Sequence, residues 1–197
     1  MIRILLTFII ISINFTFSFG QNLNPNESIL TMPESLFNYY TKVRNKLLKD
    51  NYKNTFLKLI VLPSFQAEYS LRVVKSNNDF YGIVTKVEEN IWYAKDYEKL
   101  KVEKFTSQIN NHIIELLLKK SDIILSNTQY SNINNFTIDG VSFVFANQSK
   151  SGTFRTGDNF KDYKFIKILE RLTENIISQN EFNLIESEIQ YLNSNTK

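Results

Sequence analysis

Two stretches of alternating apolar and polar residues constrain the fold of this chain most strongly. Residues 68–73 and 81–87 each place apolar side chains at every second position, and a short polar turn separates them. A period of two is typical of half-buried strands, and short polar turns between such runs favour antiparallel pairing. We therefore predict an antiparallel meander, which continues in two further strands at residues 91–94 and 101–105.

A second strand pair and several helices complete the predicted domain. Residues 141–145 and 153–156 are expected to form a hairpin, whereas the apolar run 56–62 fits either a strand or a helical turn. Thr106 or Ser107 is expected to cap a helix. A helical repeat of apolar residues occurs in four segments, near residues 31–49, 107–126, 158–177 and 180–192. The pattern predicts an α+β fold in which the meander and the hairpin form one sheet, with helices packed on one face.

The first twenty residues have the pattern of a secretory signal peptide. Arg3 provides a positive charge, Ile4–Ile13 is apolar except for two hydroxyl residues, and the small residues Ser18 and Gly20 follow. We expect cleavage after Gly20. The alternative is an uncleaved anchor, but the apolar stretch has ten residues, and a membrane-spanning helix needs about 20.

Length and composition indicate that the remaining chain is one domain of a bacterial protein. We expect residues 21–30 to form a flexible leader and residues 31–197 to form a single globular domain, because a chain of this size buries a core without disulfides. The sequence has no cysteine, so neither a lipid-anchored lipoprotein nor a disulfide-stabilised domain is possible. This favours a secreted or periplasmic bacterial protein. No later segment is apolar for long enough to span a membrane, and the net charge of +3 is too small to indicate nucleic-acid binding.

Several kinds of catalytic chemistry lack the residues that they require. His112 is the single histidine and cysteine is absent, so we expect no metal, no cofactor and no cysteine-dependent catalysis. Neither of the glycine-rich nucleotide-binding motifs occurs. A pair of carboxylates remains possible, because many glycosidases use only acids. The candidate acids are Glu68, Glu88, Glu89, Asp96 and Asp139.

Aromatic density and one arginine indicate a candidate binding site. Trp92, Phe154 and Arg155 are the candidate residues, because exposed aromatic rings and arginine mark partner or sugar sites. The alternative is that the rings belong to the core and that the segment 150–157 is a solvated hairpin tip. The same segment also combines Lys150 and Arg155 in an arrangement suited to an anion.

Three short motifs resemble a group of small, uncharacterised exported bacterial proteins. The motifs are Pro63-Ser64-Phe65-x-x-Glu68 before an alternating strand, Ile91-Trp92-Tyr93-Ala94, and Asp139-Gly140 before an aromatic strand. The resemblance covers about residues 60–180 and implies export and a single domain, and it transfers no catalytic residues.

Taken together, these patterns favour a non-catalytic exported protein that binds a macromolecular partner, either a protein or a glycan. An inhibitor, an immunity-type protein or an envelope accessory protein would fit. The alternative hypothesis is a carboxylate-dependent hydrolase of cell-wall or extracellular glycans, which requires two of the candidate acids to face each other across a cleft.

Overall fold

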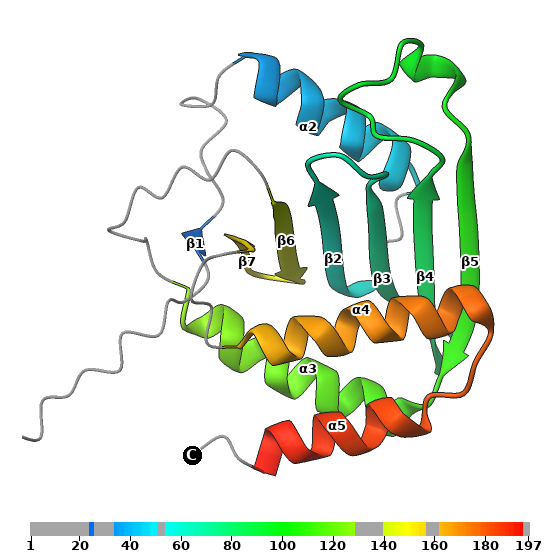
Figure 1. Ribbon diagram of the computed structural model, residues 1–197. Helices are drawn as coiled ribbons and strands as arrows, with labels where there is room; N and C mark the ends of the chain where they lie inside the picture. Colours follow the sequence, from blue (N-terminus) through cyan, green and yellow to red (C-terminus); the bar gives the residue numbers. More distant parts are fainter. Residues whose placement is uncertain (1–23, 26–33, 51–53, 129–139, 157–161, 195–197) are drawn as a thin grey trace, which may run out of the picture.

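The order of helices and strands follows the predicted alternation. The computed structural model describes residues 24–25, 34–50, 54–128, 140–156 and 162–194. Figure 1 shows the elements in this part of the chain: β1 (Asn24–Pro25), α2 (Glu34–Leu47), β2 (Thr55–Pro63), β3 (Tyr69–Ser76), β4 (Asp79–Val87), the short 3₁₀ helix η2 (Tyr97–Lys99), β5 (Val102–Ile109), α3 (Asn111–Ser126), β6 (Val141–Asn147), β7 (Ser151–Arg155), α4 (Tyr163–Ser178) and α5 (Asn183–Ser194).

The strands form one antiparallel sheet in the order β1-β7-β6-β2-β3-β4-β5. Strand β2 joins the two predicted strand groups, because it pairs with β3 of the meander on one side and with β6 of the hairpin on the other. The α+β class and the single sheet are therefore confirmed. The apolar run 56–62, for which the sequence allowed a strand or a helical turn, is a strand.

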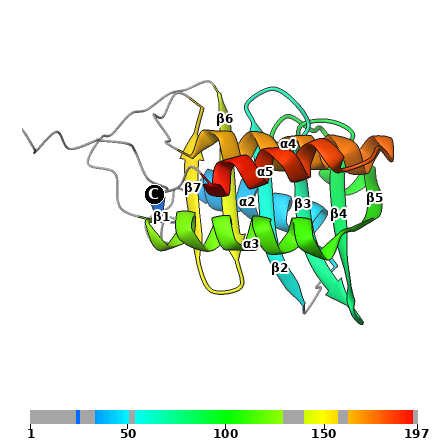
Figure 2. The same cartoon turned by 90° about the horizontal axis from the view of Figure 1, so that it is seen from below.

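The larger core lies between the sheet and three helices. Helices α3, α4 and α5 cover one face of the sheet, as both views show (Figures 1 and 2). Strand β2 contributes Leu57, Leu59 and Val61 to this core, and α4 contributes Phe165 and Leu172 among others. All five side chains are buried, so this face carries most of the apolar burial that stabilises the domain.

A smaller core lies on the opposite face, beneath α2. Ile60 and Leu62 of β2 point to this side and pack with Val43 and Leu47 of α2. The helices therefore differ from the sequence expectation in one respect, because α2 packs on the face opposite to α3, α4 and α5 (Figure 2). Strand β2 is buried on both faces, which explains its continuous rather than alternating apolar run.

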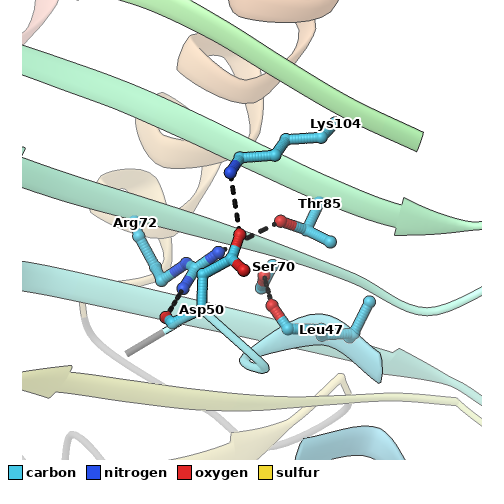
Figure 3. Close-up of polar contacts among 6 residues, drawn as sticks. All are labelled: Leu47, Asp50, Ser70, Arg72, Thr85 and Lys104. Carbon is cyan, nitrogen blue, oxygen red and sulfur yellow. Dashed lines mark hydrogen bonds and ion pairs between the residues drawn. The ribbon is translucent and has the colours of Figure 1, made fainter. Parts of the chain in front are cut away.

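Polar contacts fix the C-terminal end of α2 on the sheet (Figure 3). The buried Arg72 side chain donates from Nη1 to the carbonyl oxygen of Asp50 at 2.7 Å and from Nη2 to Thr85 Oγ1 at 3.3 Å. Ser70 Oγ donates to the carbonyl oxygen of Leu47 at 3.2 Å. Lys104 forms an ion pair with the Asp50 carboxylate at 2.8 Å. The Ser70 hydroxyl satisfies a carbonyl group that the end of α2 leaves unpaired, and the Arg72 and Lys104 contacts hold Asp50, just beyond the helix, against the sheet.

Two local predictions are wrong. Residues 91–94 form a turn rather than a strand of the meander. The meander consists of β3, β4 and β5, and β5 extends through Thr106 and Ser107 to Ile109. Neither of those two residues caps the following helix, because Asn110 occupies the cap of α3 and accepts a hydrogen bond from the His112 backbone N–H at 2.8 Å.

The predicted signal peptide at residues 1–20 lies outside the described residues. Within the predicted leader, Asn24–Pro25 form β1 and pair with β7. Across the described ranges, no helix combines the length and the apolar character that crossing a bilayer requires.

Candidate functional site

A hollow lined by aromatic rings opens at one end of the sheet, beside α2. We call it the aromatic groove, and its volume is ≈ 290 Å³. It lies where β2 and β7 end, where β6 begins, and where the β2–β3 and β4–β5 connections meet. Five aromatic side chains and one charged side chain line it among the described residues: Tyr39, Tyr40, Phe65, Trp92, Tyr93 and Arg155.

Three of these rings are exposed to solvent. The exposed fractions are 70% for Phe65, 60% for Tyr93 and 48% for Trp92. The rings of Phe65 and Tyr93 are nearly parallel, at 9° with centroids 6.3 Å apart, although they come from different connections. Trp92 packs edge to face on Tyr39 of α2, with centroids 5.1 Å apart. Single exposed apolar residues are ordinary, but a contiguous group of large rings indicates an interaction surface.

Asn90 holds the two connections of the groove together. Its buried side-chain amide donates to the carbonyl oxygens of Pro63 at 3.1 Å and Gln66 at 2.8 Å. Its Oδ1 accepts the backbone N–H of Trp92 at 2.9 Å. The three hydrogen bonds, of which the one to Pro63 is buried, satisfy backbone groups on both connections, so one side chain sets the relative positions of Phe65 and Trp92.

A buried carboxyl group lies beneath the groove. Glu68 Oε1 accepts a hydrogen bond from the Tyr39 hydroxyl at 2.8 Å, and Oε2 accepts the backbone N–H of Ile91 at 2.9 Å. Burial raises the pKa of the Glu68 carboxyl above its ordinary value, and this effect exceeds the lowering by its hydrogen bonds. Burial and the nearby Glu68 charge also raise the pKa of Tyr39. The contact fixes Tyr39 and therefore the wall on which Trp92 packs.

Glu68→Gln is expected to change how stability depends on pH. A carboxyl group with a raised pKa in the folded state stabilises the protein below its ordinary pKa of 4.5, and this contribution is lost as the pH rises through the folded-state pKa. The amide mimics the protonated group, because it can donate to the Tyr39 oxygen and accept from Ile91. Relative to the variant, the wild-type protein should therefore lose unfolding free energy as the pH rises above about 4.5.

Urea unfolding at a series of pH values measures this difference. Glu89→Gln, which removes the same charge from an exposed position in the neighbouring turn, is the control. A constant stability difference between wild type and Glu68→Gln across the series would contradict the prediction.

The structure brings together two of the three candidate binding residues. Trp92 and Arg155 both line the aromatic groove. Phe154 does not, because it is buried in the larger core and stacks on Phe143 with centroids 4.6 Å apart at 3°. Successive residues of a strand point to opposite faces, so Phe154 and Arg155 of β7 are necessarily on different sides of the sheet. Assigning Phe154 to the site was therefore wrong.

Four aromatic lining residues are not among the three sequence candidates, namely Tyr39, Tyr40, Phe65 and Tyr93. Tyr39 and Tyr40 lie on α2, which the sequence places far from residue 92. Phe65 follows Pro63 at the end of β2, and a proline that ends an apolar strand signals an exposed connection. That signal could have identified Phe65, whereas the assignment of Tyr39 and Tyr40 depends on where α2 packs.

The candidate acids that the structure describes do not line the groove. Glu68 is buried beneath it, Glu88 accepts the Lys101 backbone N–H at 3.1 Å, and Asp96 forms an ion pair with Lys99 at 2.8 Å. Glu89 is exposed in a turn, and Asp139 lies outside the described residues. The described lining residues include no acid that a glycosidase mechanism could use.

Other candidate positions are dispersed. Lys150 lies at the β6–β7 turn and donates to Ser126 Oγ at 3.2 Å, whereas Arg155 lies at the other end of β7, so the suggested anion site is not assembled from these two residues. His112 is exposed on α3, with its Nε2 atom 3.9 Å from Glu186 Oε1. Within the described ranges, no three His, Cys, Asp or Glu side chains are grouped as metal ligands.

A larger hollow of ≈ 470 Å³ lies along the C-terminal half of α2, and its lining includes the basic side chains of Arg44, Lys46 and Lys49. Its Lys46 Nζ donates to the carbonyl oxygens of Glu98 at 3.0 Å and Leu100 at 3.1 Å, and lies 4.9 Å from the centre of the Tyr97 ring. These contacts attach α2 to the β4–β5 connection. We therefore assign the candidate site to the aromatic groove.

No family model, curated protein or solved structure matches the chain.

Proposed function

We propose that this chain is an exported bacterial protein that binds a macromolecular partner, without catalysis, through the aromatic groove. The observation that carries the proposal is the group of exposed rings of Phe65, Trp92 and Tyr93, on connections that the hydrogen bonds of the buried Asn90 side chain hold together. Aromatic residues and arginine are enriched at protein interfaces, and charged residues other than arginine are depleted in their centres. The groove has this composition.

The size of the groove supports recognition of a surface rather than enclosure of a small molecule. Pockets that enclose small ligands have volumes of about 300–1,000 Å³ and bury most of the ligand. The aromatic groove, at ≈ 290 Å³, lies just below this range. Its rings of Phe65 and Tyr93 are more than half exposed, so a partner larger than the groove could cover them.

The location outside the cytoplasm is supported by the sequence. The pattern of residues 1–20 and the resemblance to small exported bacterial proteins favour export, and the absence of cysteine favours a bacterial source. An exported binding protein would meet partners in the periplasm, at the cell envelope or in the medium. The inhibitor, immunity and envelope accessory types all belong to this class.

The double variant Phe65→Ala/Tyr93→Ala is expected to lose partner binding. Tagged protein recovered from the periplasm or medium is immobilised and exposed to an envelope extract, and the retained partner is quantified. Truncating two exposed rings removes contact area without disturbing the core, so retention should fall at least about tenfold. Tyr191→Ala on α5 removes a ring with a similar exposed fraction, 65%, from the opposite side of the sheet.

Tyr191→Ala should retain the partner as well as the wild type does. Equal retention by the double variant would contradict the role of the groove. Recovery of the intact chain in the cytoplasm, with residues 1–20 attached, would contradict export.

A further inference from the structure

We propose that the aromatic groove binds a glycan chain of uncharged sugars and does not cleave it. The inference rests on the proposed function and specifies its partner as a glycan rather than a protein. Three features of the described lining residues carry it: exposed rings with flat faces, side-chain polar groups that have no hydrogen-bond partner, and the lack of acids.

The exposed rings offer flat apolar faces to a ligand. Phe65 and Tyr93 are both more than half exposed and their planes differ by 9°, so a flat ligand that lies against one ring is aligned with the other. The face of an aromatic ring carries partial negative charge. The C–H groups on the face of a sugar ring carry partial positive charge, because the neighbouring oxygen atoms withdraw electrons. Sugar rings therefore stack on aromatic faces of this kind.

Three side-chain polar groups of the groove have no hydrogen-bond partner among the described residues. They are the indole N–H of Trp92 and the hydroxyl groups of Tyr93 and Ser142. Trp92 and Tyr93 belong to the turn after Asn90, whereas Ser142 of β6 lies opposite Leu62 in the sheet, on the side that α2 covers. The three groups therefore come from two separate elements, and a ligand that covers the groove can meet all of them.

A sugar satisfies these groups better than an apolar protein surface does. Each sugar hydroxyl can donate and accept, so it can pair with the Trp92 donor and with either hydroxyl group. An apolar surface that covered the groove would leave the three groups without hydrogen bonds, which is costly. An extended peptide is not favoured as an added strand, because β2 and β6 each pair with a strand on both sides and offer no free edge.

The charges of the groove favour an uncharged chain that is bound without hydrolysis. Arg155 is the one charged side chain among the described lining residues, and it already takes part in another contact within the chain. Recognition therefore depends on the rings and on the uncharged polar groups. Hydrolysis of a glycosidic bond normally requires a pair of acids, which the described lining does not include.

Titration with oligosaccharides, followed by tryptophan fluorescence, tests this assignment. Trp92 is the single tryptophan of the sequence and lines the groove, so its emission reports binding there. The probes are β-1,4-linked oligosaccharides of glucose, of N-acetylglucosamine and of mannose. At least one of them should shift the Trp92 emission in a saturable manner and should remain intact after prolonged incubation with the protein.

Variants separate the contribution of the rings from that of the hydroxyl groups. Phe65→Ala/Tyr93→Ala should weaken the binding at least about tenfold, because it removes both flat faces. Tyr93→Phe keeps the ring and Ser142→Ala keeps the strand, so the loss of one hydroxyl group should weaken the binding about two- to tenfold in each. Tyr191→Ala on α5 should bind as the wild type does. Wild-type affinity in both hydroxyl variants would show that the polar groups are not used and would overturn the inference.

The absence of a shift with all three oligosaccharides would overturn the inference, and so would a shift that Phe65→Ala/Tyr93→Ala leaves unchanged or cleavage of a bound oligosaccharide. Protease digestion of the envelope extract distinguishes these failures from failure of the proposed function. Retention that depends on the groove should survive the digestion. If digestion abolishes it, the partner is a protein, so the binding function stands and the glycan assignment falls. If retention is independent of the groove, the proposed function itself fails.

Discussion

Asn90→Ala is expected to lower the free energy of unfolding by about 2–4 kcal/mol and to abolish partner retention. The variant leaves the carbonyl oxygens of Pro63 and Gln66 and the backbone N–H of Trp92 without the hydrogen bonds that they make in the buried floor of the groove. An unsatisfied buried polar group costs about 1–3 kcal/mol, and water entering the new cavity offsets part of the sum. The two connections then lose their relative positions, and the rings with them.

Urea unfolding followed by circular dichroism measures the stability, and the envelope-extract assay measures retention. Asn90→Asp is the matched control, because it keeps an oxygen that accepts from Trp92 but loses the donor to Pro63 and Gln66. The new carboxylate is buried against two carbonyl oxygens, so Asn90→Asp should lower stability and retention at least as much as Asn90→Ala does. Wild-type retention by a folded Asn90→Ala variant would show that the connections hold the groove without this side chain.

Phe165→Ala is expected to lower the free energy of unfolding by about 3–5 kcal/mol, because it opens a cavity in the larger core. The Phe165 side chain of α4 is fully buried and packs edge to face on Phe145 of β6, with ring centroids 5.7 Å apart at 74°. Its core lies on the face of the sheet opposite to α2. The folded fraction of the variant should therefore bind partners as the wild type does.

Denaturant titration gives the stability change, and Phe37→Ala on α2 is the matched control. Phe37 is exposed and lies outside both cores, so its truncation should change the unfolding free energy by no more than about 0.5 kcal/mol. A loss below about 1 kcal/mol in Phe165→Ala would mean that the surrounding side chains collapse into the cavity. The larger core would then contribute less to the stability of the domain than its apolar burial indicates.

The meander could be predicted because its pattern and its turn are local. Residues 68–73 and 81–87 alternate, and the register closes with Ser76 opposite Asp79, so that Asn77 occupies the positive-φ turn position which asparagine tolerates. Pattern, turn chemistry and pairing agree there. The α+β class follows from this agreement together with the helical repeats.

The turn at residues 91–94 was missed because the prediction followed the strand preference of these residue types and did not consider a local hydrogen bond. Isoleucine, tryptophan and tyrosine all favour strands. In the structure, Asn90 Oδ1 accepts the N–H two residues ahead, which is the contact that lets asparagine initiate a turn. The sequence shows an asparagine at position 90, which can compete with strand pairing in this way, but it does not show that the side chain is buried.

The position of α2 and most of the groove required the tertiary structure. The continuous apolar run of β2 indicates burial on both faces, but it does not say which helix covers the second face. The groove combines α2, the connection after β2, the turn after Asn90 and the end of β7. Sequence patterns report local periodicity, so Trp92 and Arg155 could be proposed individually, but the tyrosines of α2 could not be assigned to the same site.

The placement of α5 has a practical consequence for presenting this protein on a surface. Helix α5 ends at Ser194 on the side of the sheet that α3 and α4 also cover, and α2 lies on the other side (Figure 2). The aromatic groove is lined by Tyr39 and Tyr40 of α2. A tether or fusion partner joined beyond Ser194 therefore extends from the face that the groove does not use. Display of the domain in this orientation leaves the rings of Phe65, Trp92 and Tyr93 directed toward the medium.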